Sequence, residues 1–164
     1  MYLGSDSIVA LLETVFHDVH HASADRVIYT ATLGDRALAP ISIPAPLHLV
    51  DLRDHALDRV GLPRDGLTAT TAEHYPCTTD WAAAIHARRP GFHGMIWHSR
   101  QAELFDDAAR SEAVVLFGDR APSGAGSYPL AHNGVLNLLE GRGRTVLDEL
   151  AEHLDALVDI AGDP

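Results

Sequence analysis

The sequence has 164 residues, of which 46% are hydrophobic and 21% are charged, which are the proportions of a soluble globular domain. Its formal net charge of −11 opposes direct binding to nucleic acid or to anionic lipid. The single cysteine, Cys77, excludes an internal disulfide and fits a reducing compartment. Because the chain has no apolar stretch of about 18 residues and no basic leader, we expect one cytoplasmic domain spanning residues 1–164.

The first predicted element is a helix over residues 7–21, with Ser5 or Asp6 as its N-cap. At about 100° per residue, the apolar side chains of this helix form one broad arc. Glu13 lies about 40° beyond the edge of that arc. A carboxylate at the margin of a buried helix is therefore the first candidate functional group.

Short extended segments follow this helix. Residues 26–33 have the β-branched and aromatic content of a strand, and the prolines within residues 39–53 favour edge strands. A short helix is predicted at residues 54–60, where Gly61 and Pro63 end it.

The middle of the chain is predicted to hold one longer helix and two strands. Residues 77–89 are rich in alanine, with Thr78 or Thr79 as the N-cap and Pro90-Gly91 as the stop. Residues 95–97 and 112–118 read as strands.

The last part is predicted to contain glycine-rich turns and a final helix. The turns are "GAGSYP" (124–129) and "GRGR" (141–144), neither of which matches a phosphate-binding loop. Residues 145–160 form an amphipathic pattern, with a stripe of Val146, Leu150, Leu154, Leu157 and Val158. Strands and helices alternate without a βαβ rhythm, which favours an irregular α+β or mixed α/β domain.

A metal site is one reading of the first helix. Glu13, His17 and His20 are spaced by four and three residues and lie on one helical line. These residue types bind zinc, but the HExxH order is absent. We rank this reading below a functional glutamate flanked by surface histidines and expect no metal.

Ser99 is the second candidate functional residue. It follows the apolar strand of "GMIWHS", and loops at strand ends often line pockets. Taken alone, such a serine is more often a strand cap. No G-x-S-x-G elbow surrounds it, which argues against a serine hydrolase.

The segments "YLGSDSIVALLETVFHDV" and "GFHGMIWHSRQ" together resemble the RES domain, a family named for a polar Arg, Glu and Ser. Glu13 falls on the family's glutamate, and Tyr2 falls on its nicotinamide-side tyrosine. Ser99 closes the stretch that resembles the family's serine motif, and Arg100 beside it is expected to contact the substrate. The resemblance covers roughly residues 1–120 and continues loosely beyond.

The resemblance implies an α+β fold like that of ADP-ribosyltransferases, with small mixed sheets flanked by helices. It also implies a bacterial toxin that cleaves the nicotinamide–ribose bond of NAD+ and is neutralised by an Xre-type helix-turn-helix antitoxin. NAD would be a substrate rather than a tightly bound cofactor, with phosphate or water as acceptor. In that reaction Glu13 would stabilise positive charge on the ribose, Ser99 would orient the nicotinamide ribose or amide, and Tyr2 would stack on nicotinamide.

One part of the family pattern is absent. The family's arginine precedes the tyrosine strand, whereas this sequence begins at Met1-Tyr2. Arg26, Arg36 and Arg53 follow the glutamate and cannot occupy that position in chain order. We therefore expect either a start upstream of Met1 or a truncated domain, and the alternative function is an inactive domain that only binds a protein partner.

Overall fold

The computed structural model describes residues 1–17, 26–34, 36–70, 72–105, 111–124, 126–131 and 134–159. The main sheet has four strands in the order β1-β6-β5-β4. β6 pairs antiparallel with both β1 and β5, whereas β4 pairs parallel with β5. The strands are β1 (Tyr2–Gly4), β4 (Leu49–Asp51), β5 (Gly94–His98) and β6 (Glu112–Leu116).

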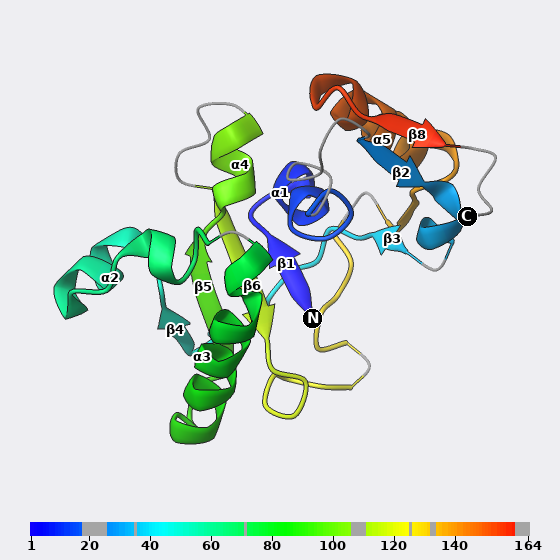
Figure 1. Ribbon diagram of the computed structural model, residues 1–164. Helices are drawn as coiled ribbons and strands as arrows, with labels where there is room; N and C mark the ends of the chain where they lie inside the picture. Colours follow the sequence, from blue (N-terminus) through cyan, green and yellow to red (C-terminus); the bar gives the residue numbers. More distant parts are fainter. Residues whose placement is uncertain are drawn as a thin grey trace.

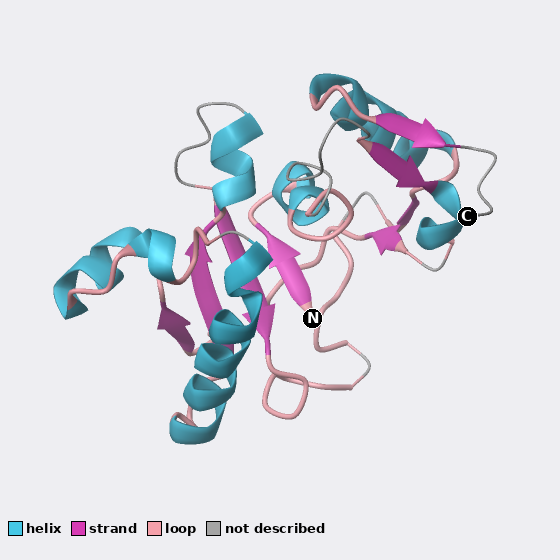
Figure 2. Cartoon of the chain, in the orientation of Figure 1, coloured by secondary structure: helices cyan, strands magenta, loops and turns pink. Residues whose placement is uncertain are grey.

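The remaining strands form two smaller sheets (Figure 2). In one, β2 (Val27–Tyr29) pairs parallel with β8 (Leu157–Asp159). In the other, β3 (Ala37–Leu38) pairs antiparallel with β7 (Leu136–Asn137). The predicted strand over residues 26–33 is thus shorter than expected, because a 3-10 helix, η1 (Thr30–Leu33), follows β2 directly.

Helices flank these sheets, with α2 and α3 beside the β4–β5 side of the main sheet and α5 beside the β2–β8 pair (Figure 1). The fold is α+β with small mixed sheets flanked by helices, as predicted. Within the described ranges, no helix has the length and hydropathy of a membrane span. The remaining elements are α1 (Ser7–Leu12), α2 (Asp54–Val60), α3 (Tyr75–Arg88), α4 (Arg100–Phe105), α5 (Gly141–His153), η2 (Arg64–Gly66) and η3 (Ala72–His74).

The main hydrophobic core excludes α3. It is formed largely by side chains of α1, β2, β6, α4 and α5, and its buried members include Val9, Leu11, Leu12, Phe16, Ile28, Ala102, Ala113, Leu147 and Leu150. No residue of α3 belongs to this cluster, and none of its described side chains is fully buried. The apolar side chains of α3 therefore do not pack into this core.

The start of α1 is fixed as the sequence predicts. Asp6 is the N-cap, because its carboxylate accepts a hydrogen bond of 2.9 Å from the amide of Val9. Gly4, at the end of β1, lies so close to Ala10 that a Cβ atom would overlap the backbone nitrogen of Ala10. The glycine therefore lets α1 pack directly over the end of β1.

The end of α1 differs from the prediction, because the helix stops at Leu12 and not at residue 21. The hydroxyl of Thr14 donates to the carbonyl of Ala10 at 2.6 Å, which competes with the backbone helix ladder. The carbonyl of Leu11 then accepts from the next three amides, residues 14–16. Glu13 is consequently the C-cap of a short helix, and residues 18–21 lie outside the described part of the chain.

Of the two helices in the middle of the chain, α2 matches the prediction and α3 begins earlier than predicted. Residues 54–60 form α2 as expected, with Gly61 in the left-handed conformation at φ 68°. However, α3 begins at Tyr75, and the hydroxyls of Thr78 and Thr79 donate to the Tyr75 carbonyl instead of capping the helix. Proline in the first turn suits this earlier start, because that position needs no amide hydrogen.

The C-terminal helix also corrects the sequence prediction. "GRGR" is the first turn of α5, where Gly143 lies against the backbone of Asn137 at a distance that a Cβ atom would not permit. The helix ends at His153, and Leu157 and Val158 belong to β8. Pairing with β2 overrides the local helical pattern of this segment.

Candidate functional site

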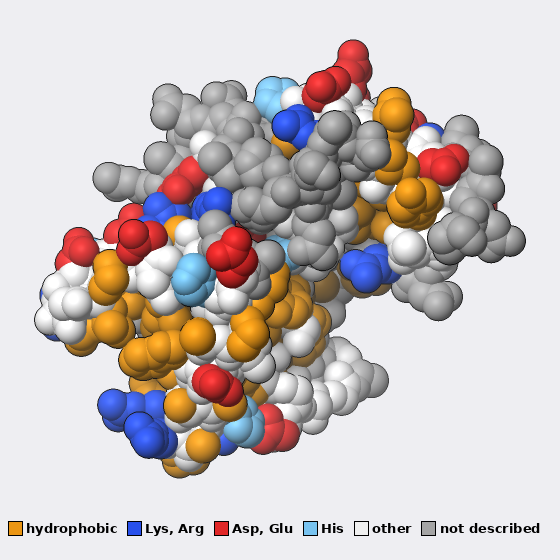
Figure 3. Space-filling model, viewed as in Figure 1, with side chains coloured by type: hydrophobic (Ala, Val, Ile, Leu, Met, Phe, Trp, Pro, Cys, Tyr) orange, Lys and Arg blue, Asp and Glu red, His pale blue; other side chains and the backbone are white. Residues whose placement is uncertain are grey.

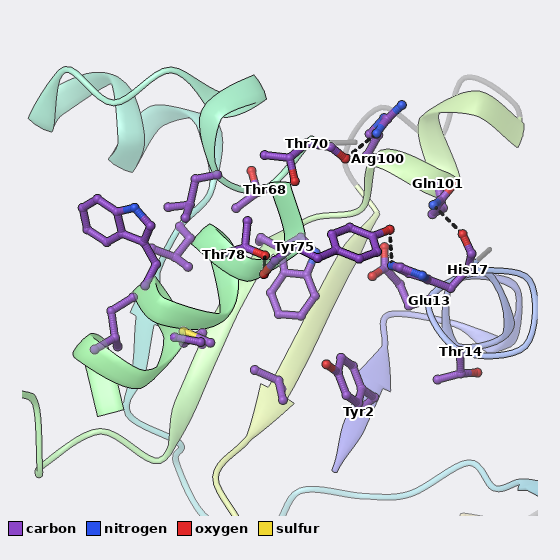
Figure 4. Close-up of a pocket in the computed structure, with 18 of the residues that line it drawn as sticks. Tyr2, Glu13, Thr14, His17, Thr68, Thr70, Tyr75, Thr78, Arg100 and Gln101 are labelled. Carbon is purple, nitrogen blue, oxygen red and sulfur yellow. Dashed lines mark hydrogen bonds between the residues drawn. The ribbon is translucent and has the colours of Figure 1, made fainter. Parts of the chain in front are cut away.

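A cavity of about 490 Å³ lies between β1, the end of α1, α3 and the segment that links α2 to α3 (Figure 4). Its size is that of a site for an organic ligand. Glu13, His17 and Tyr2 lie on one side of the view, and Thr68, Thr70 and Thr78 lie across from them. The lining residues are Tyr2, Glu13, Thr14, His17, Arg36, Leu52, Leu67, Thr68, Thr70, Tyr75, Thr78, Trp81, Ala82, Ile85, Met95, Trp97, Arg100, Gln101 and Val115.

Glu13 and Ser99, which were predicted from separate motifs, are in direct contact. The Ser99 hydroxyl donates a 2.6 Å hydrogen bond to the Glu13 carboxylate. The hydroxyl oxygen of Ser99 also accepts a 3.0 Å hydrogen bond from the amide of Ala102, so Ser99 caps the first turn of α4 as well. Ser99 is 1% exposed and does not line the cavity. The structure thus places the serine behind the carboxylate, where it fixes the position of Glu13.

The electrostatic environment of Glu13 combines opposing effects. Burial raises the pKa of Glu13 above its ordinary value of 4.5, because a half-buried carboxylate loses hydration. The hydrogen bond from Ser99 and the nearby His17 act in the other direction and lower that pKa. Burial is the largest of these effects, so the pKa of Glu13 is raised on balance. Keeping the carboxylate charged therefore lowers the stability of the folded state.

Two further side chains lie in the cavity wall beside Glu13, and no sequence motif marks either of them as part of the site. The Tyr75 hydroxyl lies 3.3 Å from Nε2 of His17 (Figure 4). The side chain of Gln101 donates a 3.1 Å hydrogen bond to the backbone carbonyl of His17. Tyr75 and Gln101 belong to α3 and α4, so no local sequence pattern links them to the segment after α1.

The arginines separate into two groups. Arg100 lines the cavity and donates a 2.6 Å hydrogen bond to the carbonyl of Thr70. Arg36, set aside in the sequence analysis because it follows Glu13, also lines the cavity. By contrast, Arg26 donates to the carbonyl of Leu154, the C-cap of α5, and Arg53 forms ion pairs with Asp51 and Glu112. Two arginines are therefore available on the walls of the cavity.

The metal-site reading gains no support in the described residues. No group of three or more His, Cys, Asp or Glu side chains within them is arranged to hold a metal ion. His17 lines the cavity beside Glu13, whereas His20 lies outside the described residues.

The burial of Glu13 predicts a pH-dependent gain in stability when its charge is removed. Because the pKa of Glu13 is raised in the folded state, protonated Glu13 contributes stability that is fully present below its ordinary pKa. That stability is lost as the pH rises through the folded-state pKa. We expect Glu13→Gln to unfold at a higher temperature than the wild type at about pH 7.5. The difference should shrink towards pH 4, and thermal unfolding at both pH values measures it. A variant less stable at the higher pH would contradict the dominance of burial.

Comparison with known proteins identifies the family of this chain. The chain matches the RES domain over residues 1–136, a range that includes Tyr2, Glu13, Ser99 and Arg100. No curated protein and no solved structure gives a significant match. The RES domain is associated with toxins of toxin–antitoxin systems and with enzymes that process NAD+. The match spans most of the 164 residues, and this chain therefore belongs to the RES-domain family.

Proposed function

We propose that this chain cleaves the nicotinamide–ribose bond of NAD+, with phosphate or water as the acceptor. The observation that carries this proposal is the Glu13 carboxylate, which lines an organic-ligand cavity and is fixed from behind by the Ser99 hydroxyl. A carboxylate held in this way cannot swing into solvent, so its charge acts at one point of the cavity.

The chemistry suits a single fixed carboxylate. As the bond between ribose C1 and the pyridinium nitrogen breaks, its electron pair neutralises the nicotinamide, which needs no proton in order to leave. Positive charge then develops on the ribose, as in glycoside cleavage. Glu13 stabilises that charge more strongly in the transition state than in the ground state. An oxygen of phosphate or water forms the new bond to C1, and one proton is released.

The other lining residues supply the binding groups. Tyr2 belongs to β1 and is 58% exposed, so its ring is accessible for stacking on nicotinamide. Arg36 and Arg100 supply guanidinium groups of the kind that hold phosphate oxygens through paired hydrogen bonds. In this assignment Ser99 is a positioning residue that acts through Glu13.

The biological setting follows from the same family. We place the chain as the toxin of a bacterial toxin–antitoxin pair that acts in the cytoplasm and is neutralised by an Xre-type antitoxin. A net charge of −11 favours association with a basic partner. This role requires that the antitoxin prevent access of NAD+ to the cavity.

The test is nicotinamide release from NAD+ by the purified chain, with and without inorganic phosphate. We expect release, and acceleration by phosphate would identify a phosphorylase rather than a glycohydrolase. Circular dichroism of the same sample establishes that the protein is folded. No release from a folded sample would contradict the proposal and favour a domain that only binds a protein partner.

A further inference from the structure

One side of the cavity is apolar and is formed by a helix that the main core does not use. Trp81, Ala82 and Ile85 of α3 line the cavity, as do Leu52 and Met95. Trp81 is 44% exposed, although a tryptophan on a helix beside a sheet would ordinarily be buried against it. The space-filling view shows hydrophobic side chains gathered over α2 and α3 (Figure 3). An aromatic ring is thus presented to a ligand-sized space rather than to the protein interior.

Polar groups lie in the walls of the same cavity. The hydroxyl oxygen of Thr68 is buried and has no hydrogen-bond partner among the described residues. Thr68 lines the cavity near Thr70, whose carbonyl accepts the hydrogen bond from Arg100 (Figure 4). A buried hydroxyl without a partner is unfavourable, so a ligand that hydrogen-bonds to it would gain affinity.

We propose that this side of the cavity binds the adenosine half of NAD+, with Trp81 stacking on the adenine and Thr68 hydrogen-bonding to the base or its ribose. The inference rests on the proposed function, because it places the second half of the same substrate. Glu13 and Tyr2 take the nicotinamide half, and Arg100, which also lines the cavity, is a cation for the diphosphate. Trp81 and Thr68 are then substrate-binding residues that discriminate a dinucleotide from a mononucleotide.

The combination of groups favours an adenine nucleotide over an aliphatic ligand. A tryptophan face stacks well on a flat heteroaromatic ring, and such stacking is sensitive to loss of the aromatic side chain. An aliphatic chain would leave the Thr68 hydroxyl without a partner and would not use the arginines.

The first experiment measures binding without catalysis. Both tryptophans of the chain, Trp81 and Trp97, line the cavity, so intrinsic fluorescence reports directly on this site. Titration with AMP is expected to quench the fluorescence of the wild type. The quenching should be lost in Trp81→Phe, which removes one fluorophore, and retained in Trp97→Phe, in which Trp81 is the only tryptophan. Thr68→Val should weaken AMP binding about tenfold while keeping the side-chain shape.

The second experiment compares two substrates that share the scissile bond, NAD+ and nicotinamide mononucleotide. Trp81→Ala is expected to lower kcat/KM for NAD+ about tenfold relative to kcat/KM for the mononucleotide, mainly through KM. Trp81→Phe should restore most of the ratio. Val60→Ala is the matched control, because Val60 is an exposed apolar residue of α2 outside the cavity.

The outcomes separate this inference from the proposed function. Cleavage of NAD+ without AMP quenching and with an unchanged substrate ratio in Trp81→Ala would overturn the adenosine site and leave the function standing. AMP quenching that depends on Trp81, in a protein that releases no nicotinamide, would support the adenosine site and contradict the function.

Discussion

Replacing Glu13 by Gln is expected to lower the rate of nicotinamide release from NAD+ by about 10³-fold or more without loss of the folded state. The change keeps the shape of the side chain and an oxygen that can accept the Ser99 hydrogen bond. It removes only the charge that opposes the positive charge on the ribose in the transition state. Removal of one fixed electrostatic group from an active site typically lowers kcat by about 10²–10³-fold, and here no second carboxylate among the described residues lines the cavity.

The measurement is kcat and KM of the variant at saturating NAD+, with Glu149→Gln as the matched control. Glu149 is exposed on α5 and does not line the cavity, so its replacement should leave both constants unchanged. Circular dichroism and thermal unfolding show whether the variant is folded. A Glu13→Gln protein that retains activity within about threefold of the wild type would remove Glu13 from the mechanism.

Glu13 and Ser99 could each be selected as candidates from the sequence because each lies in its own short motif. Glu13 breaks the apolar pattern of its helix, and Ser99 follows a run of strand residues. Their contact spans 86 residues, and the order of the main sheet together with the packing of α1 against α4 produces it. Chain order alone could not show it, so the sequence identified the residues but not the hydrogen bond.

The residues that the sequence analysis missed lack such local signals. Thr68 lies between α2 and α3, and its relevance rests on a buried hydroxyl that only the packed structure reveals. Arg36 was excluded as the family's arginine because it follows Glu13 in the chain, yet the fold brings Arg36 to the cavity. Long-range packing decides these placements, and periodicity carries no information about them.

The helix ends show the same limit at the level of secondary structure. The apolar pattern continues past Leu12, but the hydroxyl of Thr14 and the carbonyl of Leu11 redirect the backbone there. In the C-terminal segment, Leu157 and Val158 fit a helical stripe, yet they pair with β2 as a strand. In both cases hydrogen bonds that the apolar pattern does not report decide where the helix ends.

Replacing Ser99 by Ala is expected to reduce activity at neutral pH and to shift the acid limb of the pH–rate profile towards higher pH. The Ser99 hydrogen bond lowers the pKa of Glu13, against the larger effect of burial. Without that bond the pKa of Glu13 rises further above its ordinary value of 4.5, so the ionised form requires a higher pH. The loss in kcat/KM should therefore be largest on the acid side and smallest at alkaline pH.

Ser99 also caps α4, so a purely structural loss must be separated from this shift. Asn137→Ala serves as the control, because it removes a side-chain hydrogen bond to the amide of Leu139, remote from the cavity. Both variants should lose some stability, about 1 kcal/mol for a helix cap, but only Ser99→Ala should move the profile. A uniform fall in kcat/KM with an unmoved acid limb would mean that Ser99 serves α4 alone and that burial by itself sets the charge of Glu13.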